Sequence, residues 1–316
     1  MNPPKKKRPI KKARRKKRTG SFNPVRFLSY TLLLLVLLFS VCAVGYVIFF
    51  RTVVAQEIPA TLGSEIVFEE PEPPVQSEEL VVEPMPEKSV ETESKKPDLP
   101  KVAIIIDDMG YDEVLGEQLL TFPIELTFSF LPFAPYTRKL ERLAHRAGKT
   151  VFLHLPLEPK DGTFNPGCGA LYLQDSPEKQ REKIAKALQE VPHAVGVNNH
   201  MGSRFTEDKP AMANIMQEIK DRSLVFVDSF TTPGSVGLQA AHQAGVKSIG
   251  RSVFLDNVLD EEKICDQLEQ LVRVSEKNGR AIGIGHPHRE TVVAVAKCGE
   301  KYLTRVQYVG VREILF

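Results

Sequence analysis

Residues 101–316 predict an α/β fold, either a (β/α) barrel or a related incomplete barrel. Short β-branched apolar runs alternate with longer amphipathic segments about seven times along this stretch. Repeated strand-then-helix units favour parallel strands joined by right-handed crossovers. The stretch is long enough for one sizeable core. The whole chain is 42% hydrophobic and 26% charged, which excludes a wholly disordered, collagen-like or disulfide-packed protein.

The strand predictions rest on short apolar runs that end at a polar residue or a turn. They cover residues 102–106, 124–130, 150–153, 194–197, 224–227, 246–249, 281–284 and 305–309. The helix predictions rest on the amphipathic segments between these runs. They cover residues 138–147, 177–190, 209–221, 237–244 and 261–277.

Ahead of this domain, residues 27–50 form an apolar run without a charge. At a rise of ~1.5 Å per residue, a helix of this length spans ~36 Å, enough to cross a bilayer. A secretory signal peptide has a shorter apolar region, although residues 41–45 could mimic its cleavage site. We therefore expect one transmembrane anchor, with cleavage as the alternative.

The segments on either side of the anchor carry opposite charge. Residues 1–26 hold 12 Lys or Arg and no acid, which marks the cytoplasmic side of a membrane span. Residues 51–100 hold 12 Asp or Glu against 4 Lys or Arg and are rich in Pro, which predicts a disordered linker. This pattern predicts a single-pass protein of the cytoplasmic (inner) membrane, with residues 101–316 in the periplasm or elsewhere outside the cytoplasm.

A basic run can also bind nucleic acid. Contacts to nucleic-acid phosphates would require a further basic patch in the predicted domain, and residues 101–316 show none. We therefore expect no nucleic-acid partner. Three cysteines, Cys168, Cys265 and Cys298, fall in the domain. Three thiols cannot all pair, but one disulfide is possible in an oxidising compartment.

Polar residues follow most of the predicted strands at the point where each strand ends. They are Asp107 and Asp108, His154, His200, Asp228, and His286 with His288. The carboxyl ends of parallel strands meet at one edge, where such folds carry their active sites. Carboxylates and imidazoles gathered there are costly to desolvate without a metal or mutual pairing. The pattern predicts metal-dependent hydrolysis.

As an ordered set, the motifs IIIDDMG, HLPLEP, NNHMGS, VDS and GHPH resemble those of the divergent polysaccharide deacetylases. The resemblance covers residues 101–316 and implies an incomplete (β/α)₇ barrel, a Zn²⁺ or other divalent metal, and an N-acetylated cell-envelope glycan as substrate. It further implies that Asp107 is the general base, that Asp108 and His154 are metal ligands, and that His286 is the general acid.

The resemblance breaks at the third ligand. The family has a second His four residues after the first, where this chain has Glu158. Either Glu158 replaces the missing ligand, or His200 reaches in from the next strand end. We favour His200, because a residue at a strand end points into the barrel opening.

The expected chemistry is amide deacetylation. Bound zinc acidifies a water and polarises the acetyl carbonyl, Asp107 takes the proton, and His286, or His288 in its place, protonates the departing amine. Asp228 is expected to orient one of these histidines. Arg251 and Asp256 are expected either to contact substrate or to form a salt bridge.

Two other functions fit parts of the pattern. A non-catalytic glycan-binding or scaffold domain would retain the barrel and explain the missing His. A metal-dependent phosphoesterase would use similar ligands, but usually with more carboxylates or a second metal.

Overall fold

The computed structural model describes residues 99–316. The predicted basic tail (1–26), transmembrane anchor (27–50) and nearly all of the linker (51–100) lie outside the described residues and stay predictions. Within the described range, every helix is too short or too polar to cross a bilayer.

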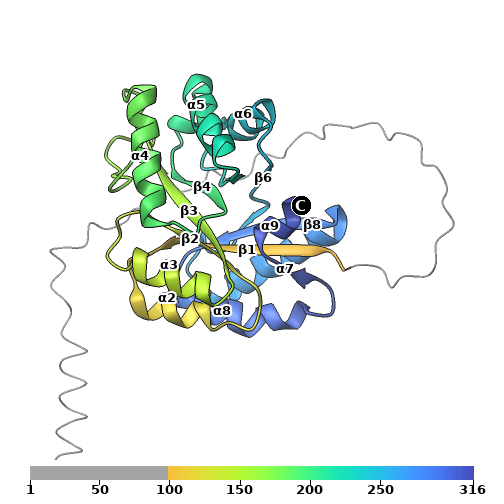
Figure 1. Ribbon diagram of the computed structural model, residues 1–316. Helices are drawn as coiled ribbons and strands as arrows, with labels where there is room; N and C mark the ends of the chain where they lie inside the picture. The colour runs from red at the N-terminus through yellow and green to blue at the C-terminus, as the bar shows by residue number, and fades with distance from the viewer. Residues whose placement is uncertain (1–98) are drawn as a thin grey trace, which may run out of the picture. The chain divides into compact units, whose positions relative to one another are not determined.

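Strands and helices alternate through most of the domain (Figure 1). The strands are β1 (Lys101–Met109), β2 (Thr127–Phe130), β3 (Thr150–Leu157), β4 (Gly196–Met201), β5 (Val225–Asp228), β6 (Ser248–Gly250), β7 (Val253–Phe254), β8 (Arg280–Gly285) and β9 (Gln307–Tyr308). The α-helices are α2 (Glu113–Leu120), α3 (Thr137–Arg146), α4 (Pro177–Glu190), α5 (Lys209–Asp221), α6 (Gly237–Ala244), α7 (Glu261–Asn278), α8 (Arg289–Gly299) and α9 (Val311–Leu315). Two 3₁₀ turns cover Phe205–Glu207 and Glu300–Tyr302.

The strands form one parallel sheet in the order β6-β5-β4-β3-β2-β1-β8-β7. Its two edge strands, β6 and β7, are separated in the chain only by Arg251 and Ser252. Three Cα–Cα steps reach at most ~11 Å, so the sheet must curl until its edges nearly meet. These edges share no ladder, and the sheet is therefore an incomplete parallel barrel, as predicted.

The amino-terminal end of the barrel is closed by β9 and α9. β9 pairs in parallel with Lys101 and Val102 at the start of β1. Thr127, the first residue of β2, accepts a hydrogen bond on its hydroxyl from the Val311 backbone N–H at 3.1 Å. Arg280, the first residue of β8, donates to the carbonyl of Ile314 at 3.0 Å. A functional opening must therefore lie at the opposite, carboxyl end.

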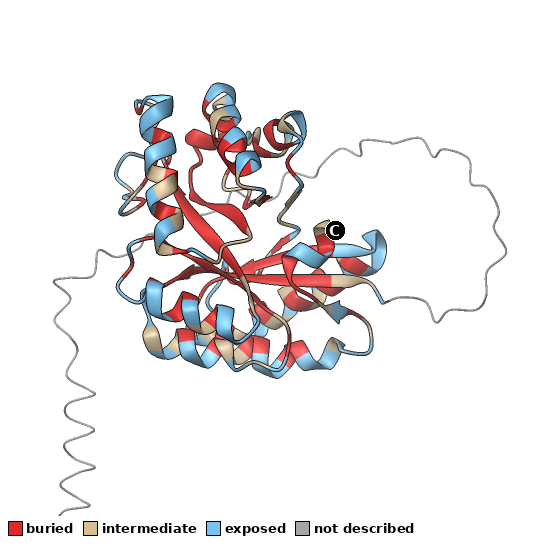
Figure 2. Cartoon of the chain, viewed as in Figure 1, coloured by how far each residue is buried: buried red, intermediate tan, exposed pale blue. Residues whose placement is uncertain are grey.

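Two hydrophobic cores lie on the two faces of the curled sheet. Alternate strand residues such as Ala103, Ile105, Phe152, Val227 and Ile284 form a small core that also includes residues of α9. The residues between them belong to a much larger core packed under the helices. Figure 2 shows the buried strands and the helices with one buried and one exposed face. This alternation decides which polar residues can face the barrel interior.

The predicted helices 177–190, 209–221 and 237–244 match α4, α5 and α6. The curved path holds eight strands, whereas the resemblance implied a seven-stranded barrel, because β7 was missed and the predicted strand 305–309 corresponds to β9, which lies off this path. A two-residue strand has too few residues to show a periodic pattern. β3 runs past its predicted end at residue 153 through Pro156, a residue that argues against a central strand. The predicted helix ranges also lack α2, α8 and α9.

The possible disulfide is present. Cys265 of α7 and Cys298 of α8 are bonded, and Cys168 is an exposed free thiol. The pair links the two helices that follow β7 and β8.

Candidate active site

The carboxyl end of the barrel gathers a group of buried polar side chains, which we call the mouth. It consists of Asp107, Asp108, His154, Asn198, His200, Asp256 and His286. Strand alternation accounts for most of this set. Because Ile105, Phe152 and Ile284 face the inner core, Asp107, His154 and His286 at even spacing beyond them face the same way.

Asp108 reaches the mouth through an irregularity in β1. Ile106 pairs with Phe128, but Met109 pairs with Phe130, so β1 holds one extra residue at this point. Asp108 lies in this bulge with φ of 52°, a region that non-glycine residues rarely occupy. Strict alternation would direct Asp107 and Asp108 to opposite faces. The bulge allows both carboxylates to approach the same histidines.

Asp108, His154 and His200 form the first cluster of possible metal ligands. One ligand atom from each lies within 4.8 Å of the others. The Asp108 Oδ1 atom is 3.1 Å from His154 Nε2 and 2.9 Å from His200 Nδ1. Burial alone would raise the pKa of Asp108, but the imidazoles of His200 and His154 lower it well below its ordinary value.

This cluster fits a divalent cation. Both Asp108 carboxylate oxygens are buried, and neither accepts a hydrogen bond from the described residues. Such atoms are costly to bury unless another charge compensates them. Two imidazole nitrogens and a carboxylate are ligands that suit Zn²⁺, and three protein ligands leave a coordination position open.

Asn198 connects the first cluster to Asp107. Its amide nitrogen donates to both Asp107 oxygens at 2.9 Å and to Ser229 Oγ at 3.1 Å. Its oxygen lies 3.1 Å from His154 Nδ1 and accepts from Ser129 Oγ. An amide oxygen can only accept, so His154 carries a proton on Nδ1, and Nε2 is the ring nitrogen that faces Asp108 and is placed to act as a ligand. Asn198 thus orients a carboxylate and a ligand imidazole together.

Asp107 is buried without being part of the ligand cluster. Its Oδ2 atom is 3.6 Å from His154 Nε2. Burial raises the pKa of Asp107, although His154, His286 and the Asn198 hydrogen bonds oppose this shift. A carboxylate with a raised pKa holds a proton more readily than one in water, which suits a general base.

His286 is held by Asp256. The ring Nδ1 lies 3.0 Å from Asp256 Oδ1, and the His286 backbone N–H donates to Asp256 Oδ2 at 2.6 Å. The other ring nitrogen, Nε2, points to the first cluster and lies 4.0 Å from Asp108 Oδ2. Burial would lower the pKa of His286, but Asp256, Asp108 and Asp107 raise it to about 9. These carboxylates therefore favour the protonated form of His286.

The prediction that Asp228 orients a histidine was wrong. Val225 and Val227 belong to the inner core, so Asp228 points with Phe226 to the helix side of the sheet. There it accepts hydrogen bonds from Ser235 Oγ at 2.7 Å and from the Phe230 backbone at 3.0 Å. Burial raises the pKa of Asp228. Asp228 thus shapes the turn before α6 instead of contacting His286.

The residues of the RSVFLDN segment also differ from expectation. Arg251 does not pair with Asp256 but donates to the carbonyls of Ser229 and Phe230 at 2.8 and 3.1 Å. Asp256 instead accepts from His286 and from Thr291 Oγ1, the latter at 2.7 Å. Asn198 is the mouth residue that sequence reasoning missed, and Asp256 was named only for a substrate contact or a salt bridge, not as the partner of His286. Even spacing from Phe254 and His200 was the signal that could have found them.

His288 lies at the edge of the mouth and precedes α8. It is half-buried, and one of its ring nitrogens lies within 4.8 Å of ligand atoms of Asp256 and His286. Burial lowers the pKa of His288. His288 thus lies near the same Asp256 carboxylate as His286, but its pKa shifts in the opposite direction.

Glu158 does not join the first cluster. Its Oε1 atom is 2.9 Å from the Arg204 guanidinium, and its Oε2 atom accepts from the Leu173 backbone N–H at 2.7 Å. Both oxygens are thus engaged outside the ligand set. Of the two candidates for the third ligand, the structure brings His200 to Asp108.

A curled, incomplete parallel barrel with a buried Asp-His cluster at its carboxyl end fits the deacetylase barrel class. Residues 104–315 match the family model described as divergent polysaccharide deacetylase. The chain belongs to this family, which confirms the resemblance drawn from the motifs.

Individual relatives agree with this assignment. The chain is 36% identical over 198 residues to the uncharacterized protein YibQ of Escherichia coli (strain K12), covering 61% of this chain and 60% of the relative. It is 33% identical over 211 residues to an uncharacterized protein of Haemophilus influenzae, and the match covers 66% of this chain and 75% of that relative. The crystal structure of uncharacterized protein ATU2773 from Agrobacterium tumefaciens C58 superposes with a TM-score of 0.66 at 25% identity. The superposition covers 70% of this chain and 92% of that structure. The match thus spans about three fifths of the E. coli relative.

Proposed function

We propose that this protein is a metal-dependent hydrolase that removes acetyl groups from an N-acetylated polysaccharide of the cell envelope. The observation that carries the proposal is the arrangement of the mouth. A buried three-residue ligand cluster lies between Asp107, which Asn198 holds, and His286, which Asp256 holds. Membership of the divergent polysaccharide deacetylases supports the reaction type.

Asp108, His154 and His200 would hold the metal, with Zn²⁺ as the first candidate. When bound, such an ion supplies Lewis-acid polarisation of the acetyl carbonyl and a more acidic water. The Asn198 bond keeps His154 in the tautomer whose Nε2 can act as a ligand.

Asp107 is the base in this proposal. Its carboxylate oxygens accept the proton of the attacking water, and the Asn198 amide keeps them in place through two hydrogen bonds. The raised pKa favours proton uptake at neutral pH.

His286 is the acid. Its Nδ1–H donates to Asp256, so the proton on Nε2 is the one that faces the reacting bond. Nε2 gives this proton to the amide nitrogen as the C–N bond breaks, because an unprotonated amine is a poor leaving group. Asp256 stabilises the imidazolium before the transfer.

For location, we propose an inner-membrane protein with one N-terminal span over residues 27–50, its N-terminus in the cytoplasm and its domain in the periplasm. The Cys265–Cys298 disulfide supports this placement, because disulfides persist in oxidising compartments.

The test is release of acetate from an N-acetylglucosamine tetramer by the full chain. A chelator should abolish turnover and zinc should restore it, and Asp108→Asn should lower both zinc binding and turnover by at least about 100-fold. His242→Ala, at an exposed histidine of α6, is the matched control and should behave as wild type. Undiminished turnover in chelator would exclude the metal role. A chain that holds no zinc when purified without chelator, and that binds the tetramer but releases no acetate even after zinc is added, would favour the glycan-binding alternative.

A further inference from the structure

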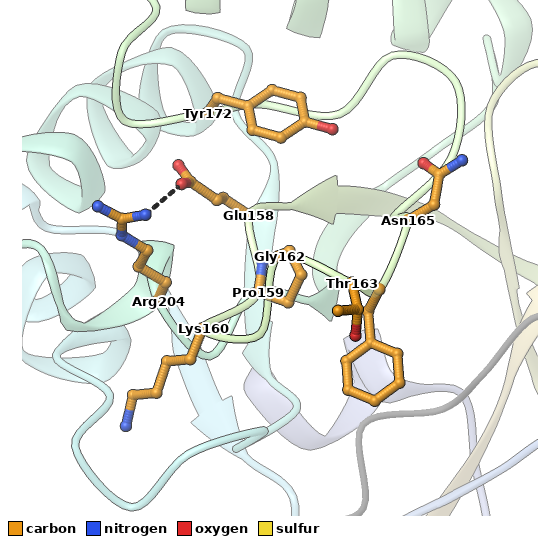
Figure 3. Close-up of a pocket in the computed structure, with 9 residues that line it drawn as sticks. Glu158, Pro159, Lys160, Gly162, Thr163, Asn165, Tyr172 and Arg204 are labelled. Atoms are coloured by element: carbon orange, nitrogen blue, oxygen red, sulfur yellow. Dashed lines mark hydrogen bonds and ion pairs between the residues drawn. The ribbon is translucent and has the colours of Figure 1, made fainter.

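A cavity of about 270 Å³ lies beside the mouth, between the loop after β3 and the turn after β4. Its walls include Glu158, Lys160, Asn165, Tyr172 and Arg204. In Figure 3 the Tyr172 ring extends over the cavity, with its hydroxyl directed toward Asn165, and Arg204 and Lys160 lie on the side away from Asn165. The cavity opens at the same end of the barrel as the ligand cluster, because β3 also carries His154 and β4 carries His200.

The walls of this cavity are held in place by local bonds. The Glu158 backbone N–H donates to the Leu171 carbonyl, and the Glu158 carbonyl accepts from the Arg204 and Phe205 N–H groups. Asn165 Oδ1 accepts from the Gly167 N–H at 2.9 Å, which fixes a turn in the loop. A site whose walls are already ordered loses little entropy on binding.

The charges around the cavity are balanced in pairs. Arg204 pairs with Glu158 at 2.9 Å, and Lys160 pairs with Glu207 at 2.7 Å. Arg204 and Lys160 remain more than half exposed, with 58% and 53% of their side chains accessible. They therefore offer polar groups to a ligand, while the two ion pairs add no net charge to the cavity. Such a region favours an uncharged ligand with many hydroxyls over an anion.

Tyr172 adds an apolar surface. It is half-buried, and the Lys183 ammonium lies over its ring at 5.3 Å from the centroid. A rigid aromatic ring beside paired polar groups can pack against the C–H face of a sugar ring while the polar groups bind its hydroxyls.

We infer that this cavity is a binding subsite for an uncharged sugar unit of the glycan, separate from the unit whose acetyl group is hydrolysed. Glu158 follows His154 by four residues along β3, which corresponds to ~13 Å of extended strand. This separation exceeds the width of one pyranose ring, so the cavity holds a different unit of the same chain. The inference rests on the proposed function for the identity of the polymer, and it gives Glu158 a binding role in place of the ligand role the family pattern implies.

The experiment measures the dissociation constant of an N-acetylglucosamine tetramer and of the monosaccharide for the full chain, by calorimetry or NMR titration. The Asp107→Asn background prevents turnover of the ligand. Tyr172→Ala should weaken tetramer binding by about 10-fold and leave monosaccharide binding at the mouth unchanged, since only the longer ligand occupies the mouth and the cavity together. Tyr172→Phe retains the ring and should bind as the parent does.

Arg204→Gln provides a second variant that retains a hydrogen-bond donor, and it should weaken tetramer binding less than Tyr172→Ala does. Equal tetramer affinity in Tyr172→Ala and its parent, or no tetramer binding by the parent at millimolar concentration, would overturn the subsite. Tighter binding of a uronic-acid tetramer than of the neutral one would overturn the charge assignment. If the chain with its native Asp107 binds the tetramer through Tyr172 but releases no acetate, the subsite stands and the proposed deacetylase function fails.

Discussion

The mouth contains two groups of histidine and aspartate that differ in how their carboxylates are satisfied. Both Asp108 oxygens face imidazole nitrogens without accepting a hydrogen bond from the described residues. Asp256 is also buried, but its oxygens accept from the His286 backbone, the His286 ring and Thr291. The same residue types therefore have different capacities: the unsatisfied carboxylate of Asp108 can accept a cation, and the satisfied carboxylate of Asp256 pairs with an imidazole.

The largest effect that sharpens this comparison is expected from Asp256→Asn. Loss of the carboxylate removes the main stabilisation of protonated His286, so turnover should fall by about 10²- to 10⁴-fold, the usual contribution of a general acid. Zinc affinity should change little, because Asp256 contacts none of the three ligands in the first cluster. Steady-state kinetics and zinc titration measure the two quantities separately. Parallel losses of zinc affinity and turnover would show that the two groups are not distinct.

An intermediate effect is expected from Asn198→Ala. The variant leaves Asp107 without its donors and His154 without the acceptor that sets its tautomer. Zinc affinity should fall by about 10- to 100-fold, as for other residues that orient a metal ligand. Asn257→Ala, at an exposed position next to Asp256, is the control for zinc titration. An unchanged zinc affinity in Asn198→Ala would refute the orienting role.

The smallest effect concerns Asp175, a satisfied carboxylate away from the mouth. Burial opposes its ionisation, but Lys179 and Lys183 lower the pKa of Asp175 from 3.8 to about 2. Because the folded pKa lies below the unfolded one, this stabilisation is present above about pH 4 and is lost as the pH falls toward about 2.

Asp175→Asn should therefore cost about 1–2 kcal/mol of unfolding free energy at neutral pH. The difference from wild type should shrink as denaturation is repeated at decreasing pH. A difference that persists at pH 2 would assign the effect to hydrogen bonding alone. Zinc affinity should not change.

Much of the fold could be predicted because its signals are local. The amphipathic pattern of residues 177–190 and 209–221, with Pro in the first turn of each, marks both helices to the residue. Short strands carry weaker signals. β7 has two residues, and Pro156 in β3 contradicts the usual composition of a central strand. Both strands can be identified only from their hydrogen bonding to the neighbouring strands.

The polar residues of the mouth were found from their place after apolar runs, but their partners were not. Asp228 and Asp256 both follow strands, and only the alternation along β5 and the closure of β8 on β7 show which one contacts His286. The bulge that directs Asp108 inward likewise depends on how β1 pairs with β2, which the sequence of β1 alone does not show.

The sequence by itself determined the barrel class, most of its strands and longer helices, and the side chains available at the carboxyl end, because hydrophobic periodicity and strand ends are properties of short segments. The tertiary structure decided which of these side chains meet. Glu158 pairs with Arg204, His200 contacts Asp108, and Asp256 rather than Asp228 contacts His286. Contacts between residues far apart in the chain depend on sheet register and curvature, and no short segment encodes either.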